Sequence, residues 1–181
     1  MNRLFFIVVL GCCAWIFPGC QHDSDYRIGR YEVVSTVIAS SCPEQASWYP
    51  VDPLLPTGFL PGYTRLMQWS LHRVGITGNG DFRVQLVIQP ADRDDLTLVV
   101  SGTLEDGVVR IDTSHDLHEA GRAWYRVIVL RGILDDETFA GTIRTMLANI
   151  PGALPSSPSI PPDSPCEIHE EFAGRRSSDG Y

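Results

Sequence analysis

The chain has 181 residues, enough for one domain with a sizeable core, and it carries a formal net charge of −8. This negative charge argues against a nucleic-acid partner and against a basic patch that would hold the domain on a membrane. All 14 basic residues are arginine. Chemistry that needs a lysine amine, such as Schiff-base formation or the lysine of a phosphate-binding loop, is therefore excluded.

The N-terminal stretch predicts an export signal. Arg3 precedes an apolar run at 4–17, and Pro18 ends this run directly before Gly19 and Cys20. A helix needs about 20 apolar residues to cross the hydrocarbon core of a membrane, so the run is too short to span it. No Ala-x-Ala-like cleavage site lies near Pro18, whereas the thiol of Cys20 can accept a lipid.

The four residues from Phe17 to Cys20 resemble the end of the bacterial lipoprotein signal, which closes on a small residue followed by cysteine. The resemblance implies that residues 1–19 form a cleaved signal peptide and that residues 20–28 form a lipidated tether. The lipid on the cysteine would include palmitate-type acyl chains. Because Gln21 rather than aspartate follows the cysteine, the resemblance also implies transfer to the outer membrane.

Cysteine usage supports an oxidising compartment. Cys12 and Cys13 lie inside the predicted signal; Cys12 is an alternative lipid site, and an uncleaved or unlipidated segment is the remaining alternative. If Cys20 carries lipid, Cys42 and Cys166 remain, and a disulfide between them would join the first predicted strand to the last. The chain-entropy model assigns roughly 4 to 5 kcal/mol to the closure of so long a loop. Two reduced thiols or a metal-binding pair are the competing interpretations.

One β domain is predicted over residues 29–174. Segments rich in Val, Ile and Thr, or with alternating apolar and polar residues, predict strands at 31–39, 65–74, 82–89 and 166–172. The segment 98–107 is echoed by 128–137, and each copy predicts a hairpin with an acidic turn. One glycine inside each copy, Gly102 or Gly132, predicts a bend or bulge.

The remaining segments carry weaker patterns. The run 139–150 fits either a helix or a strand. Proline-rich segments at 43–62 and 151–165 predict long loops, because proline excludes regular helix and central strand. Residues 175–181 predict a disordered tail.

About eight strands at short spacing predict an all-β fold built as an antiparallel meander. A barrel is favoured over a sandwich because closure removes the edges of the sheet. A bridge between the first and last strands also fits closure.

The start of the first strand, Gly29-Arg30-Tyr31, and Arg175-Arg176 after the last strand resemble the lipocalin and calycin barrels. Those barrels begin with Gly-x-Trp and carry a late arginine that packs over the tryptophan, in whose place this chain has Tyr31. The resemblance implies a barrel that binds a small apolar ligand.

Four aromatic residues of the predicted strands are candidates to line the barrel interior: Trp69, Phe82, Trp124 and Tyr125. A hollow barrel would hold an apolar ligand among them, whereas a filled barrel would use the same side chains as its core.

A polar stretch around His115, Asp116 and His118 offers side chains that bind zinc or another cation. No third histidine lies nearby, so a solvated loop is the favoured interpretation. We assign no metal and no other cofactor.

Signals for catalysis are weak. The chain has no Gly-x-Ser-x-Gly motif for a nucleophile. Adjacent carboxylates such as Glu170 and Glu171 would point apart in a strand, and we interpret them as solubilising turn charges rather than as an acid and base pair.

The sequence therefore predicts an envelope lipoprotein, anchored in the outer membrane through its N-terminal lipid. Its soluble domain would lie in the periplasm or at the cell surface and would bind a small apolar ligand or an envelope partner without catalysis. The alternative is a structural or interaction module with a filled core and no ligand, and an enzyme of unknown class is the third interpretation.

Overall fold

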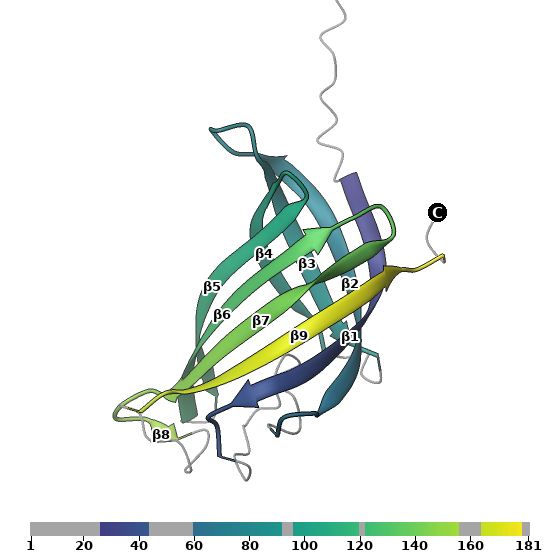
Figure 1. The fold of residues 1–181 in the computed structure, drawn as a ribbon. Coiled ribbons are helices and arrows are strands. Elements are labelled where there is room, and N and C mark those ends of the chain that lie inside the picture. The colour runs from purple at the N-terminus through teal and green to yellow at the C-terminus, as the bar shows by residue number, and fades with distance from the viewer. Residues whose placement is uncertain (1–25, 44–59, 92–95, 120–121, 156–163, 179–181) are drawn as a thin grey trace, which may run out of the picture.

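The computed structural model describes residues 26–43, 60–91, 96–119, 122–155 and 164–178 (Figure 1). The predicted signal, Cys20, most of the first proline-rich segment and half of the second lie outside these residues. The regular structure of the described part is entirely β, in nine strands: β1 (Tyr26–Ser40), β2 (Thr64–Ile76), β3 (Phe82–Pro90), β4 (Leu98–Glu105), β5 (Val108–Glu119), β6 (Arg122–Leu134), β7 (Thr138–Asn149), β8 (Leu154–Pro155) and β9 (Cys166–Arg176). Among the described residues, we find no helix with the length and apolarity that a membrane span requires.

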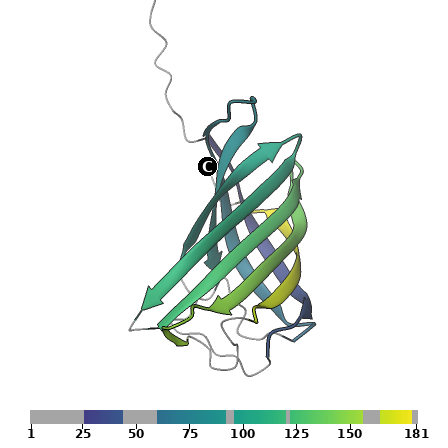
Figure 2. The same ribbon diagram turned by 90° about the vertical axis from the view of Figure 1, so that its left-hand side faces the viewer.

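The strands form one closed antiparallel barrel. Each strand from β1 to β6 pairs with the strand that follows it, β9 pairs with both β7 and β1, and β8 adds a short parallel pairing to the start of β6. The eight long strands therefore complete a ring, which Figures 1 and 2 show from two sides. This confirms the predicted all-β meander and the choice of a barrel over a sandwich. The run at 139–150, which fitted helix or strand, is strand β7.

The two ends of the barrel differ in their connections. At one end, which we call the turn end, β2–β3, β4–β5 and β6–β7 are joined by short turns, and β1 begins and β9 ends there (Figure 1). Asp106 and Gly107, with φ of 49° and 77°, form the two-residue turn between β4 and β5. At the other end, the loop end, longer connections leave β1, β3 and β7.

The repeated segments form the hairpins β4–β5 and β6–β7, as predicted. The register of β6 runs without a shift across Gly132, so no bulge occurs there. A Cβ atom at Gly132 would lie 2.4 Å from the Phe139 ring and 2.8 Å from the Phe172 ring. This glycine therefore makes room for two core aromatics.

The interior next to the turn end, the turn half, is packed with apolar side chains. Its centre is an aromatic cluster in which the Trp69 and Phe172 rings lie 4.7 Å apart and the Phe139 and Phe172 rings 5.1 Å apart. Tyr31 packs edge-on against Phe139 at 5.7 Å. The side chain of Trp69 is completely buried. The turn half is thus a filled core.

The interior next to the loop end, the loop half, is more polar. Its buried polar side chains are Ser35, Arg126, Thr145, Asn149 and Glu170. They lie alongside a second apolar cluster that contains Trp124 and the disulfide between Cys42 and Cys166, whose Cα atoms are 4.8 Å apart. The predicted disulfide is confirmed, and it links the segment after β1 to the first residue of β9.

The last strand is longer than the sequence suggested. β9 continues to Arg176, so Arg175 and Arg176 belong to the barrel rather than to the predicted tail. Arg176 pairs with Tyr31 in the antiparallel register between β9 and β1. The pairing of Arg175 and Arg176 with β1 extends the closed ring to the turn end.

Candidate binding site

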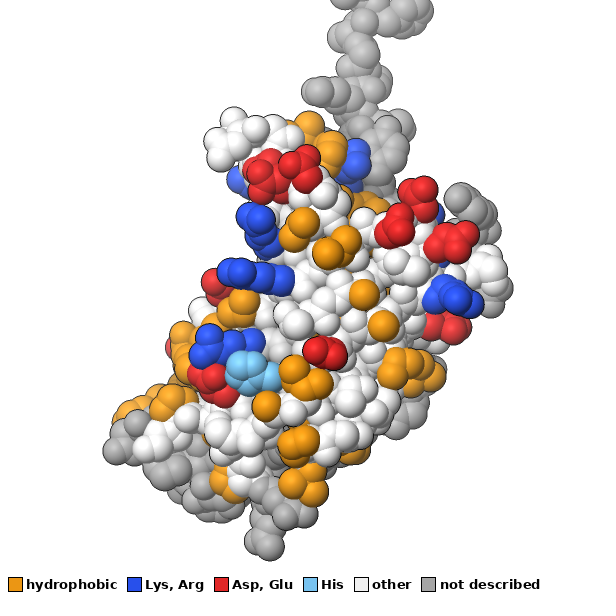
Figure 3. All heavy atoms as spheres, viewed as in Figure 1, with side chains coloured by type: hydrophobic (Ala, Val, Ile, Leu, Met, Phe, Trp, Pro, Cys, Tyr) orange, Lys and Arg blue, Asp and Glu red, His pale blue; other side chains and the backbone are white. Residues whose placement is uncertain are grey.

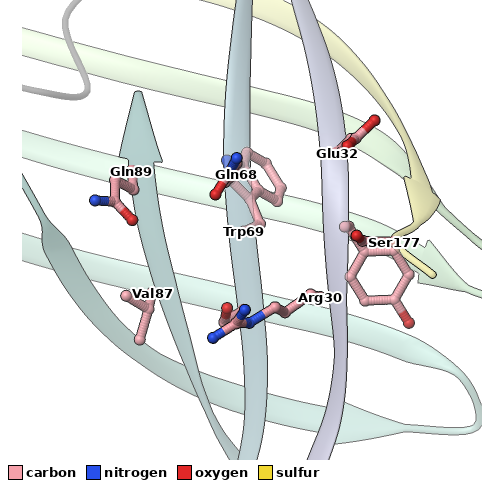
Figure 4. Close-up of a pocket in the computed structure, with 9 residues that line it drawn as sticks. Arg30, Glu32, Gln68, Trp69, Val87, Gln89 and Ser177 are labelled. Carbon is pink, nitrogen blue, oxygen red and sulfur yellow. The ribbon is translucent and has the colours of Figure 1, made fainter. Parts of the chain in front are cut away.

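A pocket of about 440 Å³ lies on the outer face of β1, β2 and β3 (Figure 4). Side chains alternate between the two faces of a strand, so Tyr31 and Val33 point into the barrel while Arg30 and Glu32 point outward. On β2, Gln68 lies between the buried residues Met67 and Trp69 and points outward. The pocket is therefore formed by the polar face of three neighbouring strands.

The pocket residues form two rows across the strands. In the first row Arg30 pairs with Ser70 and Ser70 pairs with Val87. The second row contains Glu32, Gln68 and Gln89 in the same order of strands. Since neighbouring strands lie about 4.8 Å apart and residues two apart on a strand about 6.7 Å apart, the six side chains cover roughly 10 by 7 Å. Ser177, Tyr31 and Trp69 complete the lining.

The charges of the pocket are balanced and unpaired. Arg30 extends from β1 across β2, whereas Glu32 points away from it on the opposite side of β1 (Figure 4). Within the described part of the chain, the side chains of Arg30, Glu32 and Gln68 form no hydrogen bond or ion pair. These three side chains are free to contact a ligand.

Arg176 lies on β9 opposite Tyr31 of β1 and forms hydrogen bonds to two other segments of the chain. Its guanidinium donates hydrogen bonds to the carbonyl of Ile28 and, at 3.2 Å, to the carbonyl of Asp136. A Cβ atom at Gly29 would lie 3.1 Å from the Tyr31 hydroxyl oxygen and 3.2 Å from Nε of Arg176. A side chain at position 29 would therefore crowd both groups, and glycine leaves room for them. Burial raises the pKa of Tyr31, and the positive charge of Arg176 acts in the opposite direction.

The four aromatic residues predicted to line the interior do not come together. Trp69 belongs to the core of the turn half and Trp124 to the cluster of the loop half. Phe82 is half-buried, with the Arg73 guanidinium 3.5 Å from its ring centre. Tyr125 occupies an outward position of β6, where it is half-buried.

The candidate cation ligands are also divided between the two faces. His115 occupies an inward position of β5, where its Nε2 lies 3.2 Å from the Thr113 hydroxyl. Asp116 and His118 are exposed. No group of three His, Cys, Asp or Glu side chains that could hold a metal ion is found in the described residues.

Glu170 departs from its interpretation as a turn charge. It is buried in the loop half, where Nε and Nη2 of Arg65 donate to its two carboxylate oxygens at 3.1 and 2.8 Å. The Ser35 hydroxyl donates to the same carboxylate at 2.7 Å. A signal was present in the sequence, because Glu170 shares the inward alternation of Cys166, Ile168 and Phe172.

The outer pocket was missed for another reason. Its residues are polar side chains at outward positions, the pattern of any solvated sheet face. Elsewhere on the outer surface, charged side chains of both signs lie near one another with small groups of hydrophobic side chains between them (Figure 3). No sequence signal separated Arg30 and Gln68 from such residues.

Comparison with known proteins identifies no relative. No family model matches the chain, and no significant match was found among curated proteins or among solved structures.

Proposed function

We propose that this chain is a cell-envelope lipoprotein whose barrel is a non-catalytic binding domain, and that the outer pocket on β1–β3 holds a polar part of an envelope component. The observation that carries the proposal is the pocket itself. It combines free charged and amide side chains, Arg30, Glu32 and Gln68, in a cavity of about 440 Å³. Ligand sites in proteins start at about 300 Å³, so this volume is sufficient for a small ligand.

The filled turn half supports a polar site over an apolar one. Trp69 is 0% exposed and Tyr31 2% exposed, and both pack against Phe139. A small apolar ligand would have to displace these rings. The outer pocket offers binding groups without any such rearrangement of the core.

An apolar ligand inside the barrel is the second candidate. The packing of Arg176 beside Tyr31 and Gly29 favours it, because the lipocalin and calycin barrels carry a late arginine over an aromatic residue of the first strand. Such a ligand would need space in the loop half of the interior.

The envelope location rests on the chemistry of the cysteines. The Cys42–Cys166 disulfide is of a kind that persists in oxidising compartments. Lipid on Cys20 would anchor the domain in the outer membrane, so the domain would not need a basic surface patch to stay there.

The anchor is tested by intact mass. We expect the mass of the native protein to equal that of residues 20–181 plus acyl chains, whereas the Cys20→Ser variant, purified after the same expression, should carry no acyl mass. If both proteins have masses that differ only by the substitution, Cys20 is not the lipid site.

The binding site is tested by photo-crosslinking in intact cells. A benzoyl-phenylalanine residue at Gln68 should form a defined adduct with an envelope component, whereas the same residue at Gln85, an outward position of β3 beyond the pocket, should not. Identical adducts from both positions, or an adduct from neither, would contradict the proposal. A stoichiometric lipid extracted from the purified protein would favour the interior site instead.

A further inference from the structure

We infer that the ligand of the outer pocket is an uncharged, hydroxyl-rich molecule the size of one or two sugar rings. This inference rests on the proposed function, which makes this pocket the binding site. Charge, backbone pairing, dimensions and side-chain chemistry each narrow the class of ligand.

The charges of the pocket disfavour an ionic ligand. Arg30 and Glu32 contribute one positive and one negative charge, and the other lining side chains are neutral. Arg175 faces Glu32 from β9 but does not line the pocket. A polyanion would meet Glu32 and the net charge of −8, and a cation would meet Arg30. A neutral ligand avoids both repulsions.

The backbone around the pocket disfavours an extended peptide. A peptide that adds to a sheet needs a strand edge with free N–H and C=O groups. Here β2 pairs with β1 and β3, β1 also pairs with β9, and β3 also pairs with β4. The backbone groups of all three strands are used in the barrel, so the ligand must be recognised by side chains alone.

The lining side chains match a ligand that both donates and accepts hydrogen bonds. The amide of Gln68 offers donors and an acceptor, and the Ser70 hydroxyl offers both. The Arg30 guanidinium donates and the Glu32 carboxylate accepts. Sugar hydroxyl groups also do both, so each can pair with several of these groups. Val87 adds a small apolar surface against which the C–H groups of a ring can pack.

The dimensions set the size of the ligand. Two rows across three strands cover roughly 10 by 7 Å, which is enough for one or two pyranose rings lying flat on the sheet. A longer chain would extend over the neighbouring exposed positions, where Leu66 and Val34 are apolar.

The test is an NMR titration of the full-length protein, purified in a detergent that carries no sugar group. The probes are maltose and N,N′-diacetylchitobiose as neutral saccharides, trialanine as a peptide and citrate as an anion. We expect saturable shifts of the backbone amides of Ser70, Gln68 and Gln89 with at least one saccharide, with a Kd on the order of 1 mM.

Matched variants place the binding in the pocket. Gln68→Ala should weaken saccharide binding about tenfold, the equivalent of about 1.4 kcal/mol. Gln85→Ala removes the same amide from the same outer face outside the pocket and should leave the Kd unchanged. Both residues point out of the barrel, and the amide spectra of the two variants will show whether the barrel stays folded.

The outcomes separate this inference from the proposed function. Saccharide binding that Gln68→Ala leaves unchanged would overturn the inference, as would no shift with either saccharide up to ~20 mM, well above the expected Kd. Pocket shifts with trialanine or citrate instead would overturn the ligand class and leave the pocket as a binding site. A position-specific crosslink at Gln68 without saccharide binding would do the same.

Discussion

The turn half and the loop half of the barrel interior are lined by the same eight strands but rely on different interactions. In the turn half, rings such as Trp69 and Phe139 fill the space, and stability there comes from apolar burial and close packing. In the loop half, a buried ion pair between Arg65 and Glu170 and a disulfide hold strands that carry fewer large apolar side chains.

The two kinds of core respond differently to the removal of a side chain. An apolar core loses stability in proportion to the volume removed, and neighbouring side chains can partly close the gap. A buried ion pair fails abruptly when one partner is removed, because the other charge stays buried without its counterion. The short turns between β2 and β3, β4 and β5, and β6 and β7 all lie at the end of the turn half.

The largest expected effect is loss of the disulfide. Cys42→Ser with Cys166→Ser should lower the free energy of unfolding by roughly 4 to 5 kcal/mol, because the bridge closes a loop with a sequence separation of 124 residues. Denaturant unfolding measures the loss. Amide exchange should rise first at the start of β9 and less at Phe172, in the turn half. A uniform rise in amide exchange in both halves would show that the disulfide does not act mainly on the loop half.

Removal of a core ring tests the turn half. Trp69→Ala should lower the free energy of unfolding by about 3–5 kcal/mol, since it leaves a cavity in a packed cluster. Trp69→Phe should cost much less, because the indole N–H of Trp69 has no hydrogen-bond partner among the described residues. Ile133→Ala, at a position 67% exposed, serves as the control and should change stability little. Equal losses for Trp69→Ala and Ile133→Ala would contradict a filled core.

Removal of one buried charge tests the loop half. Glu170→Gln should lower the free energy of unfolding by about 3 kcal/mol, because Arg65 loses its counterion. The double change Glu170→Leu with Arg65→Met should be far milder, since it removes both charges and keeps most of the volume. Urea titrations of the three proteins measure the difference. A double variant as unstable as Glu170→Gln would show that the pair itself stabilises the barrel.

The smallest effect concerns an ion pair on the outer face of the same half. Hydrogen bonds from Arg144, at 2.6 Å, and then from His169 lower the pKa of Glu167 below its usual range. A carboxyl with a lowered pKa in the folded state adds stability above its unfolded pKa, and this stability is lost as the pH falls through the folded value. Because the pair is exposed, we expect only a slight change in stability.

Carboxyl-carbon NMR measures this pKa directly. Arg144→Ala should raise the pKa of Glu167 toward the usual range of a glutamate, and Arg131→Ala, at another exposed position on the barrel, should not. An unchanged Glu167 pKa in Arg144→Ala would show that the arginine is not the cause.

Much of the fold was predictable because burial alternates along a strand. In β3, Val84, Leu86 and Ile88 are buried while the residues between them are not, and this pattern predicted the strand almost to its ends. Applied to β9, the same rule places Glu170 on the inward face, although we interpreted this residue as a turn charge. A charged residue there conflicted with the expectation of an apolar interior, and only the position of Arg65 on another strand resolves that conflict.

From the sequence alone, most of the strands, the meander and the pairing of Cys42 with Cys166 could be predicted, because alternation, turn residues and cysteine count are local or countable properties. The run 139–150 stayed open between helix and strand, and the loop favoured around His115 and His118 was wrong, since both residues belong to strand β5. Which side chains meet is known only from the tertiary structure. Arg30, Gln68 and Gln89 come from three separate strands, and their juxtaposition depends on the register between those strands. A period of two residues specifies the face of a sheet but not the neighbour across it, so the outer pocket and the Arg65–Glu170 pair emerge only when the barrel closes.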